Sequence, residues 1–129
     1  MHSRRLPTAC LLATFSMLTA TSSAWASSIG DPAKGKEAYA QRCAACHSID
    51  YNGTGPAHRG LLGRKAGGVA NFGYSAALNA SNIIWSEKTL ELWLADPEKL
   101  IPGQKMWISV SDAAERQNII AYLRSDIPK

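Results

Sequence analysis

Apolar residues recur at helical spacing in several segments of this 129-residue chain, and the clearest of these segments is the last. Ile119, Ile120 and Leu123 place one apolar face along it. Asp112 precedes this face and stands three residues before Glu115, a capping-box pattern with Asp in place of the usual Ser or Thr. These positions predict a helix that begins next to Asp112 and contributes to the core.

Three further helices are predicted, two of them from capping residues. Asp31 followed by Pro32 is typical of a helix start and predicts a helix over residues 33 to about 46. Ser86 caps a second segment, which ends before the next proline, and residues 75–80 are expected to form a short third helix. No stretch alternates apolar and polar residues over a useful length, so the pattern predicts an all-α domain.

Between these helices lies a segment, residues 48–73, in which seven residues are glycine. Glycine permits backbone conformations and close approaches that other residues do not, so this density argues against long regular structure. The segment predicts a loop wrapped closely around something flat. In the expected architecture the first and last helices pack against each other, and the flat group lies between the connecting segments.

The N-terminal stretch is typical of a secretory signal peptide rather than of a folded domain. Arg4 and Arg5 give it a basic start, residues 6–20 are mostly apolar, and residues 24–26 (Ala-Trp-Ala) carry small residues where a signal peptidase cuts. The apolar run is short for a membrane span, although an uncleaved anchor is the alternative. We predict that residues 1–26 are removed by cleavage after Ala26.

Cleavage leaves residues 27–129 as one small domain, since a chain of that length builds a single core. Subtracting Arg4 and Arg5 from the 14 basic residues leaves 12 against 10 acidic residues, a net charge of +2. Nucleic-acid binding usually needs a clustered basic face, so this weak positive charge argues against it. The loss of Cys10 leaves two cysteines, for which a disulfide would be the default use in an oxidising compartment.

Residues 43–47 read Cys-Ala-Ala-Cys-His, the attachment signature of c-type haem. In a helical turn the sulfurs of Cys43 and Cys46 can reach both vinyl groups of one porphyrin, and His47 then lies beneath the iron. Two alternative uses of the cysteine pair have less support in the sequence. A redox dithiol expects a βαβ context, and a zinc site needs two further ligands, for which only His58 and carboxylates are left.

Met106 is the candidate for the second axial ligand, because it is the only methionine of the predicted mature chain. It follows a Pro-Gly turn segment, and a thioether ligand favours ferrous iron and raises the reduction potential. Its alternative role is that of a core filler. His58 competes as a ligand, but it follows His47 by only eleven residues and is expected on the same side of the haem, as a structural residue.

Aromatic residues flank the loops that must wrap the haem. We expect Tyr74, Trp85 and Trp93 to face it, since their O–H and N–H groups need partners and haem propionates can serve. Arg64 is the expected partner of a propionate, because a buried carboxylate without a counter-charge is costly. The remaining aromatic side chains are expected mostly in the core.

Taken together, these segments resemble class I cytochromes c, in particular the mitochondrial cytochrome c group and its bacterial relatives. The similarity runs from about Gly30 to Leu123 and depends on stretches in the same order: GDPAKGKEAYAQRCAACHSI, TGP, GLLGRKAG, FGYS, the tryptophan at 85, TLELWLADPEKLIPGQKM and IIAYL. The resemblance implies the cytochrome c fold, a small all-α domain whose terminal helices cross and whose loops wrap one covalent haem c.

Residue roles follow from the resemblance as well. It implies that His47 and Met106 are the axial ligands and that the Pro56 carbonyl accepts a hydrogen bond from His47. Six further residues take implied positions, near the propionates or where the terminal helices cross: Arg64, Tyr74 and Trp85, then Gly35, Tyr39 and Tyr122. Five residues depart from the family pattern around the haem: His58, in place of a leucine that packs on the haem, Leu78, Trp93, Gln104 and Ile108.

These observations predict an electron carrier in the bacterial periplasm rather than an enzyme. The expected partners are redox proteins, namely a quinol-oxidising complex, a terminal oxidase, a photosynthetic centre or a dehydrogenase. We expect a monomer without stable membrane insertion. One alternative is the dedicated electron-accepting subunit of a periplasmic dehydrogenase, with Trp93 and Trp107 marking its docking face. Another is a peroxidase-like enzyme with an open haem face, for which the chain supplies no distal acid–base pair.

Overall fold

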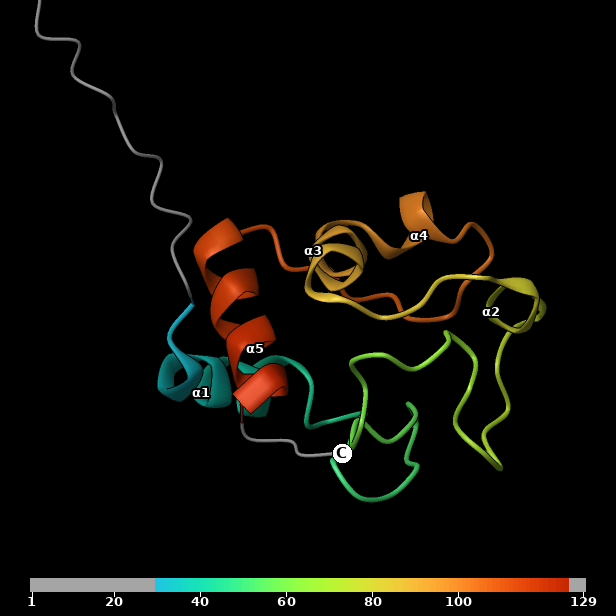
Figure 1. Cartoon of the computed structure of the whole chain (residues 1–129), viewed down its shortest axis with the longest axis horizontal. Coiled ribbons are helices and arrows are strands. Elements are labelled where there is room, and N and C mark those ends of the chain that lie inside the picture. Colours follow the sequence, from blue (N-terminus) through green and yellow to red (C-terminus); the bar gives the residue numbers. More distant parts are fainter. Residues whose placement is uncertain (1–29, 126–129) are drawn as a thin grey trace, which may run out of the picture.

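A computed structural model describes residues 30–125, and the predicted signal peptide with its cleavage site after Ala26 lies outside them. The described residues form five α-helices (Figure 1): α1 (Pro32–Arg42), α2 (Ala76–Ala80), α3 (Glu87–Ala95), α4 (Pro97–Leu100) and α5 (Ala113–Ser125). Extended pairing within this range is limited to one isolated bridge between Lys65 and Ile84. The prediction of an all-α domain is therefore confirmed. None of these helices is long and apolar enough to cross a membrane.

Three predicted helix starts carry the expected capping side chain, and Ser75, which was not predicted as a cap, caps α2. Four side chains accept backbone N–H groups of the following turn at 2.7–3.3 Å: Asp31, Ser75, Ser86 and Asp112. Ser86 forms a reciprocal capping box with Thr89. The box predicted at α5 is formed only in part, because the Glu115 carboxylate pairs with Arg42 of α1 at 2.6 Å. Caps of this kind stabilise a helix by about 1 kcal/mol each.

The prediction that the first helix extends to about residue 46 was wrong, since α1 ends at Arg42. The N–H groups of Cys43 and Ala44 both bond to the Tyr39 carbonyl, at 2.8 and 3.1 Å, so the regular ladder stops there. Residues 43–46 form a separate turn instead, which the His47 N–H closes on the Cys43 carbonyl at 2.8 Å. The short helix α4 was not predicted either.

Helices α1 and α5 cross in direct backbone contact, on the same side of the molecule in Figure 1. An added Cβ at Gly35 of α1 would lie 1.9 Å from the carbonyl oxygen of Asn118, so only glycine permits this approach. The rings of Tyr39 and Tyr122 meet across the same crossing, with centroids 5.3 Å apart. The position implied for Gly35, Tyr39 and Tyr122 is thereby confirmed.

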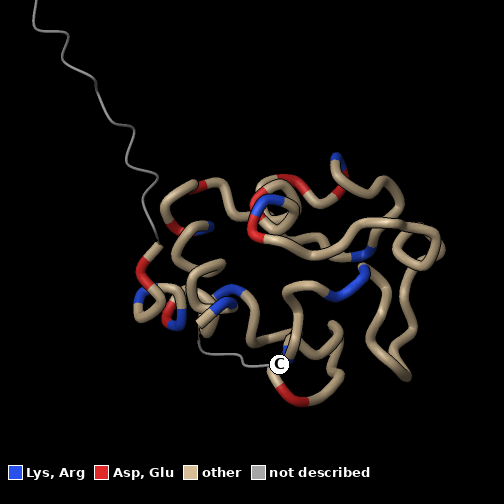
Figure 2. Tube along the Cα trace, viewed as in Figure 1, with Lys and Arg blue, Asp and Glu red and all other residues tan. Residues whose placement is uncertain are grey.

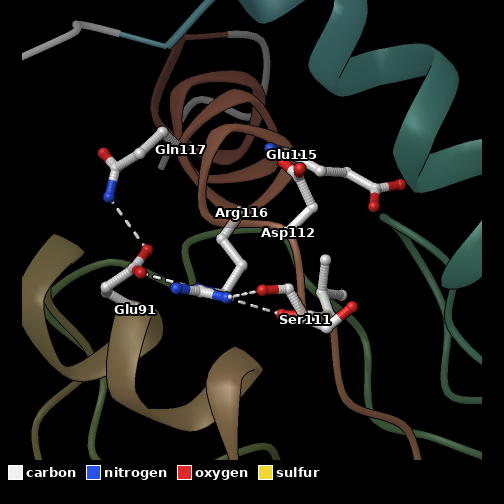
Figure 3. Close-up of polar contacts among 7 residues, drawn as sticks. Glu91, Ser111, Asp112, Glu115, Arg116 and Gln117 are labelled. Atoms are coloured by element: carbon white, nitrogen blue, oxygen red, sulfur yellow. Dashed lines mark hydrogen bonds and ion pairs between the residues drawn. The ribbon is translucent and has the colours of Figure 1, made fainter.

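Helix α3 is joined to α5 by the side chain of Arg116 (Figure 3). Its guanidinium donates to Glu91 of α3 at 2.6 Å, and also to the carbonyls of Val110 and Ser111 at 2.7 and 2.8 Å. Gln117 adds a bond of 2.9 Å to the other oxygen of Glu91. This network fixes α3 and the segment before α5 relative to the terminal helix, and hence relative to α1.

Most of the chain between α1 and α2 is loop, as its glycine content predicts (Figure 1). Gly67 shows why glycine is needed there, since its φ is +76° and an added Cβ would lie 2.8 Å from the Leu78 carbonyl oxygen. Two backbone bonds tie this loop to the segment before α3, from Gly63 N–H to the Trp85 carbonyl and from Trp85 N–H to the Arg64 carbonyl, at 2.8 and 2.9 Å.

Candidate haem-binding site

The two cysteines of the site lie on the turn that follows α1. Cys43 is half-buried, Cys46 is exposed, and neither forms a disulfide. Burial raises the pKa of the Cys43 thiol to about 11, and its position at a helix C-terminus lacks the positive dipole end that would stabilise a thiolate. A redox dithiol and a zinc site both need a thiolate, so this environment disfavours both. In the described part of the chain no cluster of three metal-ligating side chains occurs.

His47 is held with one ring nitrogen engaged and the other left as an electron-pair donor. Its Nδ1 lies 2.8 Å from the Pro56 carbonyl oxygen, which can only accept, so Nδ1 carries the proton and Nε2 has the lone pair. Burial lowers the pKa of His47, although the bond to Pro56 opposes this shift, so the neutral form is favoured. The implied hydrogen bond between Pro56 and His47 is confirmed.

The backbone of Gly55 passes close to the His47 ring. An added Cβ at Gly55 would lie 2.3 Å from Cε1 and 2.6 Å from both ring nitrogens. The Gly55 N–H donates to the Cys46 carbonyl at 2.7 Å, which returns the loop to the cysteine turn. Gly55 therefore forms part of the cradle of the imidazole, a role that the sequence signalled only through its place before Pro56.

His58 lies against His47, on the side where the sequence predicted it. The two rings stack with centroids 4.1 Å apart and planes inclined by 22°. Nδ1 of His58 shares a hydrogen bond of 3.0 Å with the hydroxyl of Tyr39. Burial lowers the pKa of His58 to about 3, and electrostatic interactions with His47 and Arg64 lower it as well, so the ring is neutral at ordinary pH.

Met106 is half-buried and packs against the core, at the end of a loop held by polar contacts. The buried side chain of Gln104 accepts a hydrogen bond from the Met106 N–H and donates to Glu98 at 3.3 Å. The Gly103 N–H also donates to Glu98, at 2.9 Å. In the sequence, Gln104 stood out only as a departure from the family pattern, and no local signal indicated that it fixes the backbone of the candidate ligand.

The expected haem neighbours fall into two groups. Trp85 and Trp93 are both buried and meet edge to face, with centroids 5.3 Å apart, and the Arg64 carbonyl bonds to the Trp85 backbone. Tyr74 forms the second group and contacts different residues, since its hydroxyl accepts a hydrogen bond from the Val69 N–H at 3.2 Å. The interpretation of Trp93 as part of a docking face was wrong, because α3 turns it into the core.

The Arg64 guanidinium donates to the carbonyls of Arg59 and Ala57, at 2.8 and 2.9 Å, and burial lowers its pKa. These two bonds use only part of its five N–H donors, so the side chain retains capacity for an anionic group. These features together fit a covalently attached haem with its propionates. The turn carries two thiols that form no disulfide, and the imidazole next to them is neutral with a free lone pair on Nε2. The two tryptophans of the site are buried, and Arg64 has N–H donors left for a propionate.

Comparison with known proteins gives the same result over the whole described domain. A family model described as Cytochrome c matches residues 32–126. "Cytochrome c 2.1" of Caenorhabditis briggsae is 42% identical over 103 residues, covering 78% of this chain and 92% of that protein. "Cytochrome c2 iso-2" of Magnetospirillum fulvum is 44% identical over 86 residues, covering 64% of this chain and 90% of that protein.

Among solved structures, cytochrome cH from Methylobacterium extorquens matches with a TM-score of 0.71 and 44% sequence identity. The match covers 74% of this chain and 99% of that chain. The similarity therefore extends to the arrangement of the helices and is not limited to the Cys-Ala-Ala-Cys-His motif.

Proposed function

The chain belongs to the cytochrome c family, whose members carry one covalently bound haem c, and we propose that it carries single electrons with the haem iron ligated by His47 and Met106. The predicted family, fold and cofactor are confirmed by this membership. The ligand assignment is supported above all by the hydrogen bond from His47 Nδ1 to Pro56, directly after the cysteine turn. That bond fixes the tautomer and leaves Nε2 to the metal.

Haem c supplies an iron that changes between the ferrous and ferric states. The residues of the chain keep the accompanying rearrangement small. Cys43 and Cys46 tether the group through thioethers, Pro56 and Gly55 hold the His47 ring, and Gln104 holds the backbone of the methionine ligand. A thioether favours ferrous iron and so raises the reduction potential. His47 and Met106 would hold the iron and leave no position on it for a substrate, so the chain would act as a carrier.

The haem environment is assigned on the same basis. Trp85 and Trp93, which are buried and meet edge to face, would form an apolar wall that keeps water from the haem iron. The remaining N–H groups of Arg64 pair with a propionate, and Tyr74 lies near the same end of the site. Exclusion of water and compensation of the propionate charge both act on the reduction potential.

Export to the bacterial periplasm is part of the proposal. It is supported by the signal-peptide pattern of residues 1–26 and by the covalent haem, since thioether attachment takes place outside the cytoplasm in bacteria. Intact-mass measurement of the haem-loaded protein from a bacterial periplasmic extract should give a chain that begins at Ser27. A haem-loaded chain that retains residues 1–26 in the membrane fraction would contradict cleavage.

The axial assignment is tested by visible spectra of the holoprotein at controlled potential. The reduced parent protein should show low-spin haem c, and the ferric form should show the weak methionine-to-iron band. Met106→Ala should abolish that band and lower the potential, whereas Trp107→Ala, which removes an exposed neighbouring side chain, should retain the band. If both the band and the potential survive in Met106→Ala, the sixth ligand is another group.

A second candidate is the dedicated electron-accepting subunit of a periplasmic dehydrogenase. It is favoured by Trp107, which is 81% exposed next to the candidate ligand, and by the absence of charged residues from residues 66–86. Figure 2 shows this uncharged stretch of chain, which includes α2, and the charged positions are spread over the rest of the described chain. Such a surface suits an apolar contact better than a purely electrostatic encounter. Stoichiometric co-purification with a catalytic subunit would support this candidate, and purification alone would support a free shuttle.

A further inference from the structure

Behind the candidate iron ligand, three rings form a continuous row that leads to the crossing of the terminal helices. The imidazole of His58 stacks on that of His47, at 4.1 Å between centroids and 22° between planes. On Tyr39 of α1 it makes a second ring contact, edge-on at 5.7 Å between centroids, together with the hydrogen bond of 3.0 Å. Tyr39 is only 6% exposed and in turn packs on Tyr122 of α5.

We propose that His58 is a positioning residue that fixes the ring plane of the iron ligand His47, and that Tyr39 fixes His58. The inference rests on the proposed role of His47 as an axial ligand. His58 thus acts through the ligand and does not itself contact the metal.

The hydrogen bond to Pro56 alone leaves the plane of His47 only loosely defined, because acceptor geometry at a carbonyl oxygen has a broad angular distribution. The close pass of Gly55 limits where the Nδ1–Cε1–Nε2 side of the ring can lie. A flat ring stacked at van der Waals distance restricts the remaining freedom, since turning the His47 plane would force the two rings together. Partners of this kind commonly orient metal-bound histidines.

The bond to Tyr39 gives the stack its rigidity. A buried tyrosine hydroxyl needs a hydrogen-bond partner, and no other partner of the Tyr39 hydroxyl occurs among the described residues. An aliphatic side chain at position 58 would fill similar volume, but it would present no flat face to His47 and would leave the hydroxyl unpaired. The histidine at this position therefore supplies two contacts that a leucine cannot.

The ring plane of an axial imidazole has a direct spectroscopic signature. In low-spin ferric haem it sets the direction of the half-filled iron orbital, and hence the pattern of the hyperfine-shifted haem methyl resonances in the proton NMR spectrum. That pattern reports the orientation of the ligand and is insensitive to a uniform loss of stability. It therefore separates positioning from a merely structural role.

The test compares ferric holoprotein variants by proton NMR. His58→Leu should change the order or spacing of the haem methyl resonances while the low-spin His/Met spectrum persists. His58→Phe restores a flat ring without Nδ1 and should return the pattern towards that of the parent. Tyr39→Phe removes a single oxygen atom and is the substitution least disruptive to folding. It should shift the pattern in the same direction as His58→Leu. Tyr51→Ala, which removes a side chain that is 70% exposed in the same loop, is the matched control and should leave the pattern unchanged.

A parental methyl pattern in both His58→Leu and Tyr39→Phe would overturn the proposal, and so would a His58→Phe pattern as altered as that of His58→Leu. Loss of the low-spin spectrum in His58→Phe would also overturn it, because His58 would then be a ligand. Failure of the proposed electron-carrier function is distinguishable from these outcomes, since it would appear in the unsubstituted protein as a high-spin spectrum.

Discussion

Replacement of Gly55 by alanine tests whether the candidate iron ligand is held by a close backbone approach. The new Cβ would lie 2.3 Å from Cε1 of His47, whereas ordinary van der Waals contact begins at 3.4 Å. The ring or the loop would have to move by about 1 Å. That shift is difficult, because Nδ1 is bonded to the Pro56 carbonyl at 2.8 Å and Nε2 is bound to iron in the proposed holoprotein.

Three contributions decide the size of the effect. Overpacking of a close-packed site costs about 1–3 kcal/mol, and weakening of the His47–Pro56 hydrogen bond costs about 1 kcal/mol. In the opposite direction, alanine restricts the unfolded chain and stabilises the fold by about 0.4–1 kcal/mol. The steric contributions are larger, so the free energy of unfolding should fall by about 2 kcal/mol.

The assay is unfolding of the ferric holoprotein in guanidinium chloride, followed by far-UV circular dichroism. With an m-value of about 4 kcal/mol/M, the midpoint should fall by about 0.5 M. Gly73→Ala is the matched control, because nothing lies within 4 Å of an added Cβ there, and its midpoint should be unchanged or slightly raised. Equal midpoints for Gly55→Ala and Gly73→Ala would refute the reasoning that the backbone confines the ring.

Three further substitutions have expected outcomes that can be checked independently. Gly35→Ala gains about 1 kcal/mol of helix propensity but brings a Cβ to 1.9 Å from the Asn118 carbonyl oxygen, so thermal unfolding should occur at a lower temperature, and an unchanged midpoint would contradict the helix crossing. Arg116→Met leaves the Glu91 carboxylate without its cation and should lower the free energy of unfolding by about 2–3 kcal/mol. This value is smaller than for a fully buried pair because the Glu91 side chain is 27% exposed. In a double-mutant cycle, adding Glu91→Gln should recover part of the lost stability. Gln104→Ala frees the backbone of Met106, the proposed ligand, and should speed displacement of Met106 by imidazole several-fold in stopped-flow mixing. A parental rate would show that the loop is held by other contacts.

The starts of the helices were predictable because a cap is a local interaction. Asp31 and Ser86 each need only N–H groups two or three residues further along the chain, and each caps as expected. The end of α1 was not predictable in this way. Neither glycine nor proline follows Arg42, and the turn at residues 43–46 depends on two N–H groups sharing one carbonyl.

The chemistry of the candidate site was predictable from residue types, but its supports were not. As the only methionine of the predicted mature chain, after a Pro-Gly turn, Met106 became the candidate ligand. The contribution of Gln104, in contrast, depends on where Glu98 lies after α4 has formed. Similarly, the sequence placed His58 on the His47 side, but the bond to Tyr39 joins residues 19 positions apart through the packing of α1 on the loop. Such contacts follow from tertiary structure, for which no local pattern exists.

The two tryptophans first assigned to a docking face show that the position of a residue in a helical apolar pattern predicts its burial better than its residue type does. Trp93 lies three residues after Leu90 and one before Leu94, which is the apolar spacing of a helix face, and it is only 7% exposed against Trp85. Trp107 follows the turn and belongs to no such face, and the fold leaves it 81% exposed. Burial of an exposed large apolar side chain becomes favourable only when another surface covers it and removes it from water. Any docking role therefore belongs to Trp107, and a docking defect in a Trp93 variant would reflect a disturbed core beside Trp85 instead.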